Sequence, residues 1–150
     1  MTLLLQEDLV NLKKYFGPLL TNLIEKLSDS KQVVRDMVLE CCSQMIKNSR
    51  PNVFALQIVK SLQHANWHVR EGVLTLIVRC IIVQGTQDSR KADTGSLCTN
   101  AALIEEICFL VKVEDKKQLS QMGIDALALI IATSPNKAKS ENLVMKELGV

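Results

Sequence analysis

Apolar residues recur every three to four positions along most of this chain, which is the spacing of one face of an α-helix. Short polar stretches that contain Gly, Pro, Asn, Asp or Ser separate the apolar segments, and these residue types begin and end helices. The pattern predicts about eight helices. The segments are 3–14, 18–27, 31–47, 53–62, 67–83, 101–112, 117–133 and 137–148.

Two helix starts depend on particular residues. Gly17 and Pro18 follow the first segment, and proline is tolerated in the first turn of a helix, so we expect a new helix to begin at Pro18. Asn66 precedes the fifth segment and is a candidate N-cap. The second half of the fifth segment is apolar on nearly every side, so we expect it to be buried on both sides.

Composition favours the same fold class. Aromatic residues make up only 3% of the chain, and there are 6 Gly and 3 Pro. A β-sandwich or barrel normally has more aromatic and β-branched residues and more turn glycines. The apolar fraction of 47% is enough to build a core. The 150 residues therefore predict one all-α domain.

One long segment breaks the helical pattern. Residues 85–100 are mostly polar or flexible and include two glycines. They have no apolar periodicity, so we expect a mobile loop that faces solvent.

Charge and hydropathy exclude two classes of partner. Lys plus Arg is 18 and Asp plus Glu is 16, a net charge of +2, whereas a non-specific nucleic-acid binder has a strong basic excess. No apolar stretch approaches the ~20 residues of a membrane span, and the short run after Met1 is unlike a signal peptide. We expect a cytoplasmic protein that binds neither nucleic acid nor membranes.

The five cysteines do not form a recognisable metal or redox motif. Their number is odd, and no two are separated by two residues. Most lie in or beside apolar helical segments, so we expect reduced thiols that mainly pack in the core, with a redox role for the adjacent first two as the alternative. They are Cys41, Cys42, Cys80, Cys98 and Cys108.

An internal repeat organises the chain. The tripeptide Val-Arg-Asp that begins at Val34 matches Val-Arg-Glu that begins at Val69, 35 residues later, and the apolar positions downstream agree. The segment from Leu119 fits the same frame after an offset of 50 residues. A helix, tight turn and helix repeated at this period predicts an α-solenoid of stacked antiparallel helix pairs.

Each repeat carries an arginine with two possible roles. Arg35 and Arg70 each lie at a helix start beside an acidic residue. Such an arginine either bonds a neighbouring acid or a turn carbonyl and fixes the stacking of the repeats, or contacts a partner directly. An internal repeat position favours the first role.

Two stretches carry a closer resemblance. Residues 16–35 and 62–74 are similar to TOG domains of the cytoplasmic linker-associated proteins (CLASP) and of related ciliary TOG-array proteins, which belong to the HEAT-repeat superfamily. The block Asn-Trp-His-Val-Arg-Glu-Gly from Asn66 to Gly72 is the most specific part. Residues 9–82 carry most of the resemblance. The chain departs from the family pattern in several places. No segment matches the family's first helix pair or the tryptophan in its turn, Leu119-Ser120-Gln121 replaces Val-Arg-Asp/Glu in the third pair, and His68 stands where the family commonly has Arg or Lys.

The resemblance implies a fold and a function. TOG domains are flat ARM/HEAT-type superhelices that bind tubulin through the turns within their helix pairs, along one narrow edge. Residues 28–32, 64–68 and 112–117 are the matching turns, so the implied role is microtubule regulation in the cytoplasm and cytoskeleton, including cilia. Cations and amides suit acidic tubulin. The implied partner-binding residues are Lys31, Asn66, Trp67, His68, Lys112, Lys116 and Lys117.

Alternatives remain open beside this reading. A generic HEAT-repeat scaffold for protein–protein interaction, without tubulin affinity, has the same helix pattern. Trp67 is either an anchor for a partner or a hydrophobic cap over a helix start.

Catalytic and metal chemistry have little support in the sequence. None of the common nucleotide-binding, hydrolase or metalloprotease motifs occurs, and the two histidines fall in one turn. His64 and His68 have the spacing of two metal ligands on a helix face, but no third ligand completes a set. We therefore expect no enzyme activity, no metal and no cofactor.

Overall fold

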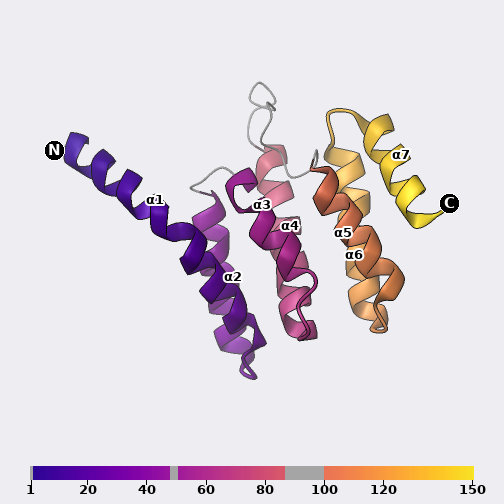
Figure 1. Ribbon diagram of the computed structural model, residues 1–150, viewed down its shortest axis with the longest axis horizontal. Coiled ribbons are helices and arrows are strands. Elements are labelled where there is room, and N and C mark those ends of the chain that lie inside the picture. The colour runs from indigo at the N-terminus through magenta and orange to yellow at the C-terminus, as the bar shows by residue number, and fades with distance from the viewer. Residues whose placement is uncertain (1, 48–50, 87–99) are drawn as a thin grey trace.

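The computed structural model describes residues 2–47, 51–86 and 100–150, and these residues form helices and short connections without a β-strand (Figure 1). The all-α prediction is confirmed over these ranges. The helices are α1 (Thr2–Glu25), the 3-10 turn η1 (Lys26–Ser28), α2 (Gln32–Lys47), α3 (Pro51–Ser61), α4 (Trp67–Thr86), α5 (Ala101–Val113), α6 (Lys117–Thr133) and α7 (Lys137–Leu148).

The predicted break at Gly17 and Pro18 is wrong. Pro18 lies inside α1, so the first two predicted helices are one helix. Proline inside a helix removes one backbone hydrogen bond and crowds the carbonyl four residues earlier, which commonly bends the helix. Figure 1 shows that α1 changes direction along its length. Leu20 and Ile24, on the turns after Pro18, are buried in the core, and their packing offsets the lost hydrogen bond.

Later helix ends follow from capping residues. The side chain of Asn100 accepts the backbone N–H of Leu103 at 3.1 Å and begins α5. Asn136 accepts the N–H of Lys139 in the same way and begins α7. Gly149, with φ of 75°, ends α7 in the left-handed conformation that glycine tolerates.

The predicted loop at 85–100 begins too early. Helix α4 extends through Thr86, so its last two residues were assigned to the loop. Residues 87–99, on which most of this prediction falls, lie outside the described ranges.

The helices pack in two rows. Helix α1 contacts α2, α3 contacts α4, and α5 contacts α6, and each pair turns back on itself. Contacts also join α1 to α3, α3 to α5 and α5 to α7 in one row, and α2 to α4 to α6 in the other (Figure 1). Every helix therefore contacts both its pair-mate and its neighbour in the row, except α7, the last helix of the chain, which packs on α5 and α6.

A continuous core lies between the rows. It includes the repeat positions of α4, because Val69, Val73 and Ile77 are fully buried. A Cβ atom added to Gly72 would lie 2.8 Å from Cδ1 of Leu27. The missing side chain thus lets α4 approach η1 of the preceding pair closely.

Candidate protein-interaction edge

The turns within the three helix pairs lie at the same edge of the molecule. Figure 1 shows the η1–α2, α3–α4 and α5–α6 connections together at the lower side, and the α6–α7 connection at the opposite side. We call the lower side the turn edge and define it by residues 28–32, 64–68 and 112–117. All seven residues that the sequence implicates in partner binding fall in these three turns.

A shared hydrogen bond shapes the three turns. In each one, a side chain accepts the backbone N–H of the residue two positions later, which closes a tight loop before the second helix. The pairs are Asp29 with Lys31 at 2.8 Å, His64 with Asn66 at 3.0 Å and Glu114 with Lys116 at 3.2 Å. The internal repeat in the sequence did not reveal this equivalence, because three different residue types make the same hydrogen bond.

Arg35 holds the first turn from the helix that follows it. Its Nη1 donates to the carbonyl oxygens of Asp29 at 2.6 Å and Ser30 at 3.1 Å, and its Nη2 donates to Oε1 of Gln32. The guanidinium therefore satisfies turn carbonyls that no helix hydrogen bond reaches.

Arg70 does the same in the second turn and also reaches the third. Its Nη1 donates to the carbonyl oxygens of His64 at 2.7 Å and Ala65 at 3.1 Å. Its Nη2 lies 2.8 Å from Oε2 of Glu114, whose side chain is only 6% exposed. Both arginines thus bond carbonyl oxygens of their own turns, which is the first of the two roles that the sequence suggested for them.

The third turn lacks this arginine. Ser120 occupies the equivalent position in α6, and its hydroxyl donates to the carbonyl oxygen of Val111 at 3.3 Å. Glu114 connects this turn instead to Arg70 of the preceding pair.

Trp67 is the centre of a small aromatic and cationic cluster. Its ring stacks on the ring of His68, with centroids 3.7 Å apart and planes at 29°. Nζ of Lys116 lies 4.6 Å from the centroid of the Trp67 ring, within the range of a cation–π contact. The indole is half-buried and packs against the core. It therefore caps the start of α4 and also contributes to the turn edge.

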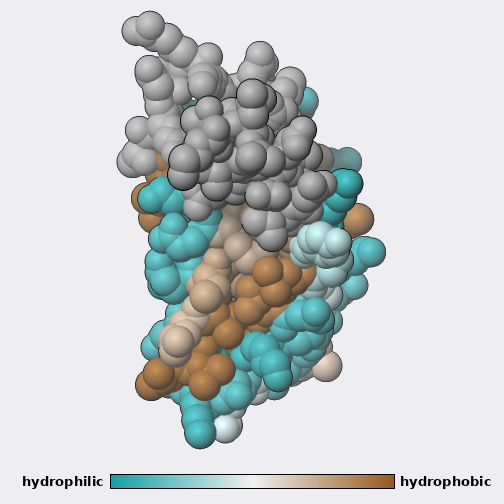
Figure 2. All heavy atoms as spheres, turned by 90° about the vertical axis from the view of Figure 1, so that its left-hand side faces the viewer, coloured by the Kyte–Doolittle hydropathy of each residue, from teal (hydrophilic) through white to brown (hydrophobic). Residues whose placement is uncertain are grey.

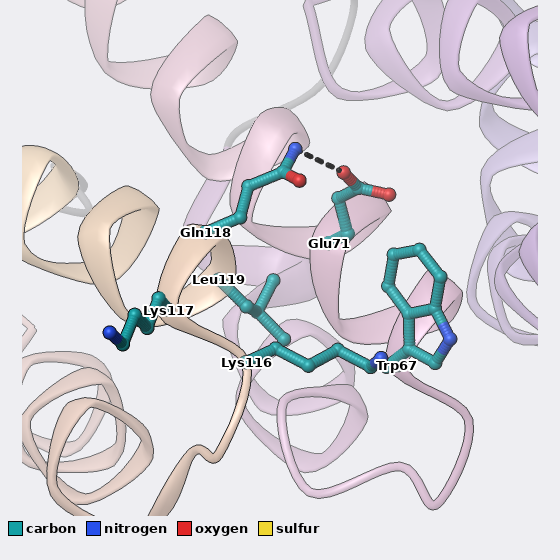
Figure 3. Close-up of a pocket in the computed structure, with 6 residues that line it drawn as sticks. All are labelled: Trp67, Glu71, Lys116, Lys117, Gln118 and Leu119. Carbon is teal, nitrogen blue, oxygen red and sulfur yellow. Dashed lines mark hydrogen bonds between the residues drawn. The ribbon is translucent and has the colours of Figure 1, made fainter.

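A shallow hollow of about 210 Å³ opens beside this cluster. In Figure 3 the Lys116 side chain runs toward Trp67, whereas Lys117 points away from it. Gln118 donates to Glu71 across the hollow at 3.3 Å (Figure 3). Six residues line the hollow: Trp67, Glu71, Lys116, Lys117, Gln118 and Leu119.

The remaining site residues of the sequence prediction are placed differently. Oδ1 of Asn66 accepts the N–H of His68 at 2.9 Å, so its amide oxygen caps α4. Lys31, just before α2, and Lys112, in the last turn of α5, have exposed side chains. Neither lysine lines the hollow. The structure therefore brings together Trp67, His68 and Lys116, with Lys117 at the rim.

The two histidines have separate surroundings. Nδ1 of His64 accepts the Asn66 N–H, and its Nε2 lies 3.2 Å from Oε2 of Glu25. The ring of His68 stacks on Trp67, and its buried Nδ1 has no hydrogen-bond partner. Among the residues with described positions, no three His, Cys, Asp or Glu side chains gather as a metal site would require.

Three of the four cysteines with described positions are buried. Cys42, Cys80 and Cys108 are buried, whereas Cys41 is exposed, which corrects its assignment to the core. Neighbouring residues on a helix point about 100° apart, so only one of the adjacent pair faces inward. Burial raises the pKa of the Cys42 and Cys80 thiols to about 12 and that of Cys108 to about 11. Cys98 lies outside the described residues.

Comparison with known proteins adds no relative. No protein-family model, curated protein or solved structure matches the chain. Within the described ranges, no helix combines the length and apolar character needed to cross a bilayer. A functional assignment therefore rests on the repeat geometry and on the chemistry of the turn edge.

Proposed function

We propose that this chain is a HEAT-type α-solenoid, related to TOG domains, that binds tubulin through its turn edge. Its role is recognition of a protein partner in the cytoplasm and cytoskeleton, and catalysis has no part in it. The proposal is supported by the stacking of the helices, the equivalence of the turns and the chemistry of the cluster around Trp67.

The stacking supports a solenoid because contacts run along two rows. Each helix pair buries its inner faces against the next pair, as repeat proteins do when single units cannot bury a core alone. Arg35 and Arg70, 35 residues apart, bond carbonyls at equivalent positions of successive turns. This three-dimensional equivalence supports the HEAT-like register of the first two helix pairs.

The observation that carries the proposal is the contact between Lys116 and Trp67 on the turn edge. A half-buried indole offers apolar contact at small entropic cost, and the ammonium above its ring is available to a carboxylate. Lys31 and Lys112 are exposed in the neighbouring turns. The net charge is only +2, so attraction to acidic tubulin arises locally at this edge and is screened by salt.

Fluorescence anisotropy with purified, labelled αβ-tubulin tests the proposal. Trp67→Ala is expected to weaken binding by at least ~2 kcal/mol, or about thirtyfold, because it removes a desolvated anchor. The double variant Lys31→Glu and Lys116→Glu is expected mainly to slow association and to flatten the salt dependence.

The matched control is Lys137→Glu, which makes the same charge change at an exposed position of α7, away from the turn edge. It is expected to leave binding within about twofold. Unchanged binding in both edge variants overturns the turn-edge proposal. A wild-type chain that does not bind tubulin makes the HEAT-repeat scaffold for another protein the leading function.

A further inference from the structure

The second turn is closed by a histidine, whereas the first and third turns are closed by carboxylates. Nδ1 of His64 accepts the N–H of Asn66 at 3.0 Å, in the role that Asp29 and Glu114 have in the other two turns. Carboxylates stay ionised between about pH 8 and about pH 5, whereas histidine is the side chain that ordinarily changes its charge in this range. Of the three turns, the second therefore has a closing acceptor of the type that takes up a proton near neutral pH.

The contacts of His64 assign its ring protons. Nδ1 accepts the Asn66 N–H and so carries no proton, which leaves Nε2, 3.2 Å from Oε2 of Glu25 at the end of α1, as the nitrogen that donates. Arg70, from α4, bonds the carbonyl oxygen of His64 and not its ring. Glu106, from α5, bonds the side chain of the preceding residue. The carboxylate of Glu25 is therefore the charged group that contacts the ring.

We propose that the second turn is a proton-sensitive switch in the turn edge, closed while His64 is neutral and loosened when its Nδ1 takes up a proton. A protonated Nδ1 is a donor and cannot accept the Asn66 N–H, so this hydrogen bond breaks. Nε2 keeps its contact with Glu25, which becomes an ion pair. The Glu25 side chain is 60% exposed, so this ion pair adds little stability and the turn has a net loss of one hydrogen bond.

Asn66 transmits this loss to the start of α4. Its Oδ1 caps the helix by accepting the N–H of His68 at 2.9 Å, and Trp67, the next residue, contacts Lys116 of the third turn. Arg70 still holds the two turn carbonyls, so the loosening is confined to the Asn66 side of the turn. The switch goes beyond the proposed function, because it acts in the free chain and does not depend on which partner the turn edge binds.

The first turn provides an internal reference in the same protein. It is closed by the same kind of bond, from the Lys31 N–H to the Asp29 carboxylate, and residues 28–32 contain no histidine. It also lies at the surface. Figure 2 looks at the α1–α2 end of the molecule, and hydrophilic atoms form its lower tip, where the first turn lies. The Lys31 N–H is therefore expected to be unaffected by protonation of His64.

NMR of the isotope-labelled full chain between about pH 8 and about pH 5 tests the inference. At the upper end, His64 is expected to show an unprotonated Nδ1 and a protonated Nε2. As the ring takes up a proton, protection of the Asn66 N–H from hydrogen exchange is expected to fall about fivefold, after correction for the intrinsic effect of pH on exchange, because one hydrogen bond is lost. Protection of the Lys31 N–H is expected to stay constant. The ring signals of His68, which lies near Glu71, are followed separately.

His64→Asn is the matched variant. The amide oxygen of asparagine accepts an N–H two residues later without titrating, so protection of the Asn66 N–H is expected to be equal at both ends of the pH range. Circular dichroism establishes that the variant is folded. A protonated Nδ1 at the upper end, unchanged Asn66 protection in the wild type, an equal loss at Lys31, or a pH-dependent loss that persists in His64→Asn overturns the inference.

Discussion

Arg70 and Glu114 join the second helix pair to the third through one carboxylate oxygen. Nε and Nη2 of Arg70 lie 2.9 Å and 2.8 Å from Oε2 of Glu114, while Nη1 bonds the two turn carbonyls of its own pair. All three guanidinium nitrogens are therefore engaged. The contact connects the turn that precedes α4 to the turn that precedes α6.

The first prediction concerns this contact. Arg70→Ala is expected to destabilise the fold by about 3–5 kcal/mol, because it leaves the buried Glu114 carboxylate unpaired and frees two turn carbonyls. Arg35→Ala is the matched comparison, since Arg35 bonds its own turn and no buried acid. Urea unfolding of both variants measures the difference. An Arg70→Ala loss no larger than that of Arg35→Ala contradicts the prediction.

The second prediction concerns the close approach of α4 to η1. Gly72→Val is expected to cost about 1–3 kcal/mol, since the new side chain meets Leu27 where even a Cβ atom lies at 2.8 Å. In a double-mutant cycle with Leu27→Ala, the combined loss is expected to be smaller than the sum of the single losses, because the cavity admits the added methyl groups. Thermal or urea unfolding gives the four free energies, and strict additivity would argue against the contact.

The third prediction concerns thiol reactivity. Among the four cysteines with described positions, only Cys41 is expected to react rapidly with a maleimide near neutral pH in the folded monomer. Cys42, Cys80 and Cys108 are shielded, and their raised pKa values leave them as neutral thiols. Mass spectrometry of peptides after brief labelling measures this order. Rapid modification of Cys80 in the folded chain would contradict it.

The fourth prediction follows from the same pKa shifts at alkaline pH. The folded-state pKa of Cys42 and Cys80 is about 12 against an ordinary value of 9.0. Their contribution to stability is fully present below pH 9 and is lost as pH rises toward 12, because the unfolded chain releases these protons first. Cys80→Ala is expected to make the alkaline fall in unfolding free energy less steep, although the variant is less stable at neutral pH. An unchanged slope would show that other groups cause the fall.

The fifth prediction uses Trp67 as the single tryptophan of the chain. Removing the ammonium near its ring with Lys116→Met is expected to alter the emission of the free protein and to cost roughly 0.5–1 kcal/mol of stability. Lys137→Met, the control on α7, is expected to change neither. Emission spectra and urea unfolding provide the two measurements. Identical spectra for wild type and Lys116→Met would place the lysine away from the ring in solution.

Local chemistry explains which helix ends were predictable. The side chains of Asn100 and Asn136 begin a helix, and the backbone preference of Gly149 ends one, without tertiary help, so α5 and α7 match their predicted ranges closely. Pro18 was misleading because its local preference competes with burial of Leu20 and Ile24. The competition is decided by packing, which a single sequence does not display.

Only some contacts of the turn edge could be predicted from the sequence. The repeat placed Arg35 and Arg70 in equivalent positions, and the structure gives them equivalent carbonyl partners. The long-range contacts of Glu114 with Arg70 and of Lys116 with Trp67 join residues more than 40 positions apart. No pattern within one helix or turn specifies such pairs, because they depend on how successive helix pairs stack.

The hydrogen bonds of Arg35 and Arg70 to turn carbonyls, which we call the arginine clamps, hold the shape of the first two turns mainly through the backbone. Arg35 and Arg70 each lie in the helix that follows the turn and donate hydrogen bonds to main-chain carbonyl oxygens of that turn. Every residue type supplies such a carbonyl. The exposed side chain of Lys31, in the first of these turns, takes no part in the clamp. Substitution of Lys31 therefore changes the surface of this turn at little cost in stability, and under the proposed function it would change what the edge binds while the fold stays constant.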